Sequence, residues 1–133
     1  MEIKWKTLAR DTAIVWVAQN LGGLVIGFMA ALLVGRNAIL NPRVQMALVF
    51  SNFVFGVVGF TIVGALARTK RFEHLLLVGL CVWLIAAPTV LFMPVTLLQW
   101  FIGGGLLQIV VVLVGGGLSY IFSRPSAVQG SGV

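Results

Sequence analysis

The chain has 133 residues, of which 60% are hydrophobic and 9% are charged, and its formal net charge is +6. Soluble domains carry about 25% charged residues, so this composition excludes an ordinary soluble domain and indicates a single membrane-embedded unit. The excess of Lys and Arg does not indicate nucleic-acid binding, because these residues lie beside the ends of apolar segments and do not alternate with aromatic residues.

Four apolar segments fill most of the chain, and each approaches or exceeds the roughly 20 residues needed to cross about 30 Å of hydrocarbon. They cover residues 12–34, 44–67, 74–93 and 97–122. The expected fold is all-α: a polytopic membrane protein whose transmembrane domain, residues 12–122, is an antiparallel bundle of four transmembrane helices. Residues 1–11 are expected to form a cytoplasmic juxtamembrane segment, and residues 123–133 a disordered cytoplasmic tail.

Positive charges are distributed unevenly between the two sides that a four-span chain defines. Seven of the nine Lys and Arg residues fall on the side of the two termini and the 68–73 connection, and only Arg36 and Arg43 fall on the other side. Positive residues in short loops stay in the cytoplasm, so both termini are predicted to be cytoplasmic, in a bacterial-type inner or plasma membrane. Six of the seven form a basic rim expected to attract anionic lipid head groups: Lys4, Lys6, Arg10, Arg68, Lys70 and Arg71.

Local capping signals predict where the helices begin. Asp11 is expected to cap the first helix, because its side chain can accept a hydrogen bond from an unpaired backbone N–H. Asn41 followed by Pro42 is typical of a cap and a first helical residue. Thr96 and Gln99 have the spacing of a reciprocal capping box. Pro88 lacks an N–H and is expected to kink the third span.

Small residues repeat along the helices at four-residue spacing, which places them on one face and lets another backbone approach closely. One series lies in the first span and a second, which includes Val112, lies in the fourth, while the second span adds further glycines. The residues predicted to pack against other helices are Gly23, Gly27, Ala31, Gly35, Gly56, Gly59, Gly104, Gln108 and Gly116. Such a surplus of small-residue surface favours contact with another chain, through self-association or with a different membrane protein.

Polar residues inside the apolar spans allow two interpretations. They either form hydrogen bonds between helices or line a narrow path for water, a small neutral solute or an ion. The candidates for such a lining are Asn20, Asn52, Thr61 and Gln108. No Asp, Glu, Lys, Arg or His lies deep in a predicted span, although proton- and ion-coupled carriers usually place an ionisable residue there.

Catalytic and cofactor-binding patterns are missing from the sequence. There is no Ser/His/acid set, no membrane-depth pair of acids, no phosphate-binding glycine loop and no set of ligands at metal spacing. His74 is expected to be an interfacial residue beside Glu73, with a role as a haem or pigment ligand left open. We therefore expect no enzyme activity, no metal and no cofactor.

The sequence favours a small non-enzymatic integral membrane protein that acts as a subunit, stabiliser or assembly partner through its glycine-lined helix faces. Its expected partners are membrane lipids, including anionic lipids, and another membrane protein or a second copy of itself. The alternative is an oligomeric passive pore or small-solute transporter.

Overall fold

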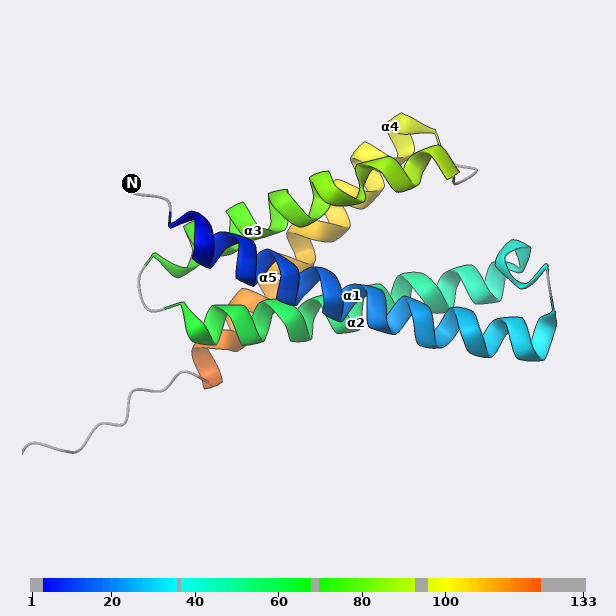
Figure 1. Cartoon of the computed structure of the whole chain (residues 1–133), viewed down its shortest axis with the longest axis horizontal. Coiled ribbons are helices and arrows are strands. Elements are labelled where there is room, and N and C mark those ends of the chain that lie inside the picture. The colour runs from blue at the N-terminus through cyan, green and yellow to red at the C-terminus, as the bar shows by residue number, and fades with distance from the viewer. Residues whose placement is uncertain (1–3, 36, 68–69, 93–95, 123–133) are drawn as a thin grey trace, which may run out of the picture.

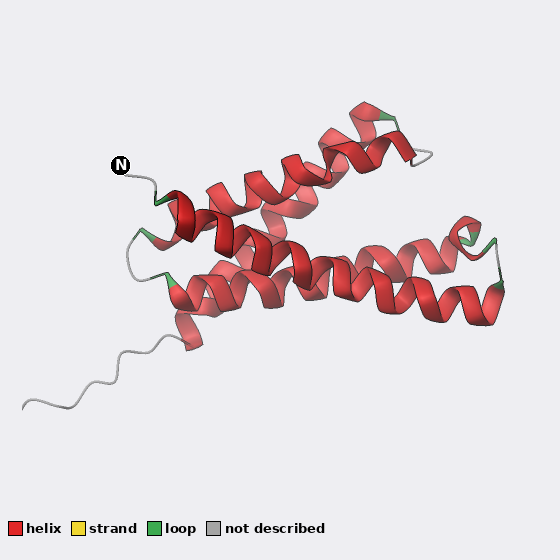
Figure 2. Ribbon diagram, viewed as in Figure 1, coloured by secondary structure: helices red, strands yellow, loops and turns green. Residues whose placement is uncertain are grey.

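A computed structural model of the chain describes residues 4–35, 37–67, 70–92 and 96–122. These residues are almost entirely helical, and no strand occurs among them (Figure 2). The elements are α1 (Trp5–Val34), the short 3₁₀ helix η1 (Ala38–Leu40), α2 (Pro42–Leu66), α3 (Arg71–Ala86), the 3₁₀ helix η2 (Ala87–Phe92), α4 (Leu97–Gln99), the π-helical turn η3 (Trp100–Gly104) and α5 (Gly105–Phe122).

Two of the three predicted caps are confirmed. The Asn41 side chain accepts a hydrogen bond of 2.9 Å from the Arg43 backbone N–H, and Pro42 is the first residue of α2. Thr96 and Gln99 form the reciprocal capping box that begins α4. The prediction for Asp11 is wrong, because α1 begins six residues earlier, at Trp5, and Asp11 lies inside the helix.

A kink is predicted at Pro88, whose missing N–H removes an α-helical hydrogen bond, and the structure shows a change of helix type there. The α-helical hydrogen bonding of α3 ends at Ala86, and the chain continues as the 3₁₀ helix η2 to Phe92. A second irregularity follows in η3, where the wider π-helical turn joins α4 to α5 without breaking the helical path. The stretch from Leu97 to Phe122 is thus one long helix of 26 residues.

Three helices of the described residues are long and apolar enough to cross a membrane: Trp5–Val34, Pro42–Leu66 and Leu97–Phe122. The α-helical part of the expected third span is shorter, since α3 has 16 residues before the change at Pro88. The structure therefore supports an all-helical, membrane-spanning protein.

Figure 1 shows two helical hairpins that meet at one end and diverge toward the other. The first hairpin is α1, η1 and α2, and the second runs from α3 to α5. The start of α1, the start of α3 and the end of α5 lie at the shared end. The turn between α1 and α2 and the short helix α4 lie at the diverging ends, so the hairpins contact each other mainly along the half nearest the start of α1.

The main core lies where the hairpins meet and draws on all four long helices. Its buried side chains are Leu8, Val15, Phe60, Val63, Leu75, Val78, Val82, Val111 and Val112. Phe60 is fully buried at its centre. A second, smaller cluster of Ala30, Ala38 and Val44 holds the far end of the first hairpin together.

Glycines let the helix backbones approach one another around this core. A Cβ placed on Gly115 would lie 2.6 Å from the Phe60 Cβ and 2.9 Å from the Val57 carbonyl oxygen. A Cβ on Gly79 would lie 2.8 Å from a methyl carbon of Val112. By contrast, a Cβ on Gly117 would meet nothing within 4 Å. Neighbouring glycines of α5 therefore have different roles: Gly115 permits the contact with α2, and Gly117 does not.

The pair Gly115→Ala and Gly117→Ala tests this difference within one helix. Gly115→Ala is expected to destabilise the protein by about 1–3 kcal/mol, because the added methyl group overpacks against α2. Gly117→Ala is expected to be neutral or to stabilise by up to about 1 kcal/mol, because Ala is the better helix former. The free energy of unfolding in mixed detergent micelles measures both, and equal effects would contradict this packing.

Candidate functional site

A buried carboxylate joins α1 to α3 near the shared end of the hairpins. The Asp11 side chain is 2% exposed, and its Oδ1 accepts a hydrogen bond of 2.8 Å from Nε of Arg10 and forms an ion pair of 2.8 Å with Nη2 of the same residue. Its Oδ2 lies 2.8 Å from Nε2 of His74 on α3. Because a carboxylate can only accept hydrogen bonds, the His74 ring donates through Nε2. We call this set of three residues the Asp11 cluster.

Burial makes the Asp11 cluster a specific link between helices. A buried charge without a partner is costly. Buried charges therefore persist only where charged or hydrogen-bonding groups surround them. Asp11 and His74 are 63 residues apart in the sequence, so local sequence patterns give no sign of their contact. Asp11 is the only aspartate and His74 the only histidine of the chain, and each lies beside an apolar segment. This is the one feature of the sequence that could have suggested that the two residues pair.

Arg71 forms a second contact between the ends of helices. Its guanidinium carbon lies 4.3 Å from the ring centroid of Tyr120 on α5, and its Nη1 donates to the Ser119 hydroxyl at 3.5 Å. The Arg71 Nε also donates to the Ala67 carbonyl oxygen at 3.3 Å. Cations over aromatic faces are attracted by the ring quadrupole, so this residue ties the start of α3 to the end of α5.

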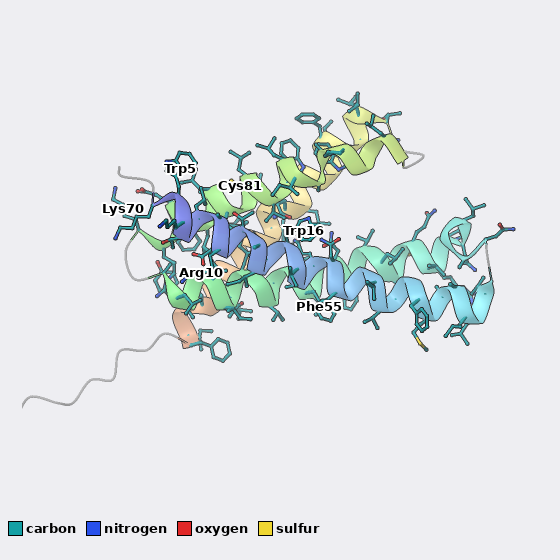
Figure 3. All side chains as sticks on the ribbon, in the orientation of Figure 1. Trp5, Arg10, Trp16, Phe55, Lys70 and Cys81 are labelled. Atoms are coloured by element: carbon teal, nitrogen blue, oxygen red, sulfur yellow. The ribbon has the colours of Figure 1, made fainter. Side chains whose placement is uncertain are left out.

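The residues of the predicted basic rim differ in their contacts. Lys4 and Lys6 are exposed, Lys70 is exposed and pairs with Glu73 at 3.4 Å, and Arg10 and Arg71 make the contacts described above. Figure 3 shows Arg10 and Lys70 at the end of the molecule where α1 and α3 begin. Arg68, the sixth residue of the rim, lies outside the described residues.

Two of the predicted lining residues make hydrogen bonds between helices. The Gln108 Oε1 of α5 accepts from Nε2 of Gln19 on α1 at 3.4 Å. The Thr61 hydroxyl of α2 donates to the Val57 carbonyl oxygen at 2.7 Å and lies 3.3 Å from the Gly115 carbonyl oxygen of α5. Both side chains thus connect the first hairpin to α5.

The other two lining candidates lie on the outside of the chain. Asn20 is exposed, and its Nδ2 donates to the Trp16 carbonyl oxygen at 2.7 Å, one turn earlier in the same helix. Asn52 is also exposed. The structure therefore does not bring Asn20, Asn52, Thr61 and Gln108 together around a common interior.

Four of the predicted packing glycines lie against other helices of the same chain. A Cβ on Gly59 would lie 3.2 Å from the Val15 backbone of α1, and one on Gly56 would lie 2.7 Å from the Gln19 amide. In the series of the fourth predicted span, a Cβ on Gly104, the last residue of η3, would lie 3.7 Å from Nε1 of Trp83, a residue of α3. Further along the same series, a Cβ on Gly116 would lie 3.1 Å from Leu75 of α3. The two glycines of this series, Gly104 and Gly116, therefore lie against α3.

The series of small residues predicted in the first span has different surroundings. A Cβ on Gly23 or Gly27 would meet nothing of this chain within 4 Å, and Ala31 is exposed. We call these three residues the α1 small-residue face. Gly35, the last of the predicted series, ends the helix with φ +86°, a backbone conformation that glycine adopts without strain.

Glycines that the four-residue pattern did not select also form close contacts. Gly22 lies against Ser51 and Phe55 of α2, and Gly64 lies against Ser119 of α5. Among the described residues, no group of three or more His, Cys, Asp and Glu side chains is placed to hold a metal ion. Asp11, Gln108 and Thr61 are polar side chains that link helices in the contacts described above.

Replacing the buried carboxylate tests the strength of the Asp11 cluster. Asp11→Ala is expected to destabilise the protein by about 3 kcal/mol, because it leaves His74 without its partner in a largely buried position. Glu73→Ala is the matched control, since Glu73 pairs with Lys70 at 3.4 Å and both side chains are more than half exposed. Such pairs contribute at most about 1 kcal/mol. Unfolding in mixed micelles measures both variants, and a loss for Asp11→Ala no larger than the control's would show that the cluster is not a structural link.

Comparisons with protein-family models, with curated proteins and with solved structures give no match. The function proposed for the chain therefore rests on its own geometry.

Proposed function

We propose that the chain is a small non-enzymatic membrane protein that acts as a subunit, stabiliser or assembly partner and docks through the α1 small-residue face. In this arrangement it crosses the membrane four times with both termini in the cytoplasm. The 16 residues of α3 and the six of η2 would together reach about 36 Å at their usual rises, which exceeds the roughly 30 Å of hydrocarbon.

The shared end of the two hairpins supports this orientation. The start of α1, the start of α3 and the end of α5 lie together (Figure 1), and the exposed residues Lys4, Lys6 and Lys70 lie at the same end. The positive-inside rule assigns such an end to the cytoplasm. Lysines there would also attract anionic head groups, at roughly 1 kcal/mol per residue near the surface.

The observation that carries the docking proposal is how this chain uses its glycines. Seven of them sit where a Cβ would lie within about 3.2 Å of another helix: Gly22, Gly56, Gly59, Gly64, Gly79, Gly115 and Gly116. Glycine thus marks close helix contact throughout the core. Gly23 and Gly27 are four residues apart on α1, and a Cβ on either would meet nothing within 4 Å in the part of the chain that the structure describes.

The energetics of glycine in a helix favour a partner at this face. Each glycine in a helix interior costs roughly 1 kcal/mol relative to Ala, and in a lipid-facing position no close packing offsets that cost. Helices in membranes associate through small residues because these let backbones approach and increase van der Waals contact. A helix of a second membrane chain, either another copy or a different protein, supplies the missing contact at Gly23, Gly27 and Ala31.

The alternative of a passive pore or small-solute transporter has less support. Thr61 and Gln108 are engaged in hydrogen bonds within the chain, and Asn20 and Asn52 are exposed on its surface. A polar path would therefore need several copies arranged so that these residues converge.

Gly27→Leu tests docking at the α1 small-residue face. The larger side chain is expected to weaken association by at least about tenfold, because it holds the partner backbone away. Ala65→Leu is the matched control, since Ala65 is an exposed small residue of α2 outside this face. Mass photometry or crosslinking of protein extracted in mild detergent reports the size of the complex. A complex of unchanged size in Gly27→Leu would contradict the proposal.

Labelling from outside the cell tests the orientation. In a Cys81→Ser background, we expect Lys4→Cys and Ser126→Cys to resist a membrane-impermeant maleimide in intact cells, because both termini are cytoplasmic. Asn37→Cys, in the turn between α1 and α2, is expected to react. Reaction at only one of the two termini would show an odd number of spans and refute the four-span arrangement.

A further inference from the structure

A cavity of about 290 Å³ lies between α3 and α5. Its walls are mostly apolar and include Leu76, Leu80, Trp83, Phe101, Gln108 and Ile109. Leu76, Leu80 and Ile109 are each half exposed, so the cavity opens on the outer surface of the bundle. Pockets for small molecules are typically about 300 Å³ or larger and combine apolar walls with a few polar groups, and this cavity is at the lower end of that range.

Two side chains of the cavity wall each carry a hydrogen-bond donor that is buried without a partner. Nε1 of Trp83 and Nε2 of Gln108 have no acceptor in the part of the chain that the structure describes. The other end of the Gln108 amide is occupied, because Oε1 accepts from Gln19. A buried donor left unsatisfied costs about 1–3 kcal/mol, so each of the two indicates a missing acceptor.

Aromatic packing fixes the direction of the Trp83 donor. Its ring stacks on Trp100 with centroids 4.7 Å apart and planes 5° apart, and Phe101 meets it edge-on at 4.8 Å. Both partners belong to the π-helical turn η3. Single π-helical turns inside α-helices occur frequently at functional sites. The turn brings two aromatic rings against Trp83, and this contact holds its N–H in place before any ligand arrives.

The position of the two donors along their helices indicates where a ligand would come from. Trp83 is about 18 Å from the start of α3, and Gln108 is about 21 Å from the end of α5, at 1.5 Å per residue. In the four-span arrangement both lie close to the middle of the bilayer. Water is scarce at that depth, and a molecule entering the open side of the cavity comes from the lipid phase.

We propose that this cavity binds the carbonyl end of an apolar, lipid-soluble molecule, whose oxygen accepts hydrogen bonds from Trp83 Nε1 and Gln108 Nε2. A carbonyl oxygen only accepts, so it satisfies both donors without adding a hydrogen that needs its own partner, as water would. Quinone rings and lipid esters share this chemistry. The depth of the two donors in the bilayer favours the quinone. The ester carbonyls of phospholipids lie near the membrane surface, whereas the two donors lie near the middle of the bilayer.

Binding of decylubiquinone to the full chain in detergent tests the proposal. Trp83→Phe keeps the aromatic packing and removes only the N–H, and Gln108→Leu removes the amide. Each is expected to raise the dissociation constant about tenfold, the loss typical of one hydrogen bond. Trp16→Phe and Asn52→Leu are matched controls, since neither residue lines this cavity, and they are expected to bind as the wild type does. Native mass spectrometry gives the amount bound.

A parallel titration with dioleoyl phosphatidylcholine distinguishes the two sources of the carbonyl. If both cavity variants lose binding of decylubiquinone, the ligand is of the quinone type. If both variants lose binding of the phospholipid and not of the quinone, the ligand is a lipid ester. Failure of both probes to bind the wild type, or binding to Trp83→Phe as tight as to the wild type, overturns the proposal. If Gln108→Leu does not fold, Gln108→Asn replaces it. Complex size is not part of this measurement, so the result is separate from that for docking at the α1 small-residue face.

Discussion

Close approach of helix backbones at glycine holds the four long helices around Phe60. In lipid, apolar side chains gain little by leaving the solvent for one another, so packing and interhelical hydrogen bonds determine which helices associate. The Phe60 ring is fully buried, and it fits because Gly79 of α3 and Gly115 of α5 present only backbone to it. The remaining features of the bundle, including the cavity beside Gly79, depend on this small separation of the helices.

Polar contacts fix how the hairpins are aligned once the glycines allow them to meet. Asp11 with His74 joins α1 to α3, Gln19 with Gln108 joins α1 to α5, and Thr61 reaches the backbone of α5. The bonds of Gln108 and Thr61 are of the kind that contributes about 0.6 kcal/mol on average in membrane proteins, and a shift of one residue along a helix would break them. They therefore act mainly on specificity, and they all lie in the half of the molecule where the hairpins touch.

Features with a local cause were predictable from the sequence. The caps at Asn41 and Thr96 depend on residues within one turn of each other, and the structure confirms both. Pro88 also acts locally: a kink is predicted there, and the chain changes from α-helix to 3₁₀ helix. Asp11 was misassigned because a capping pattern is also local, whereas the partner that determines its position, His74, is 63 residues away. Four-residue spacing identified helix faces but not their neighbours: it selected Gly23 and omitted Gly22, although Gly22 is the one that touches α2. Which face meets which helix is a property of the whole bundle.

The π-helical turn at Trp100–Gly104 also constrains the length of the last membrane helix. A turn of this kind is equivalent to one residue inserted into an α-helix, and each residue of an α-helix rotates the chain by about 100°. Deleting one residue there would restore regular α-helical geometry but would swing Trp100 away from the face it shares with Trp83. Inserting or deleting one residue in this segment therefore changes the length of the helix by only about 1.5 Å but rotates one end relative to the other by about 100°, and the stacking of Trp83 on Trp100 is sensitive to that rotation.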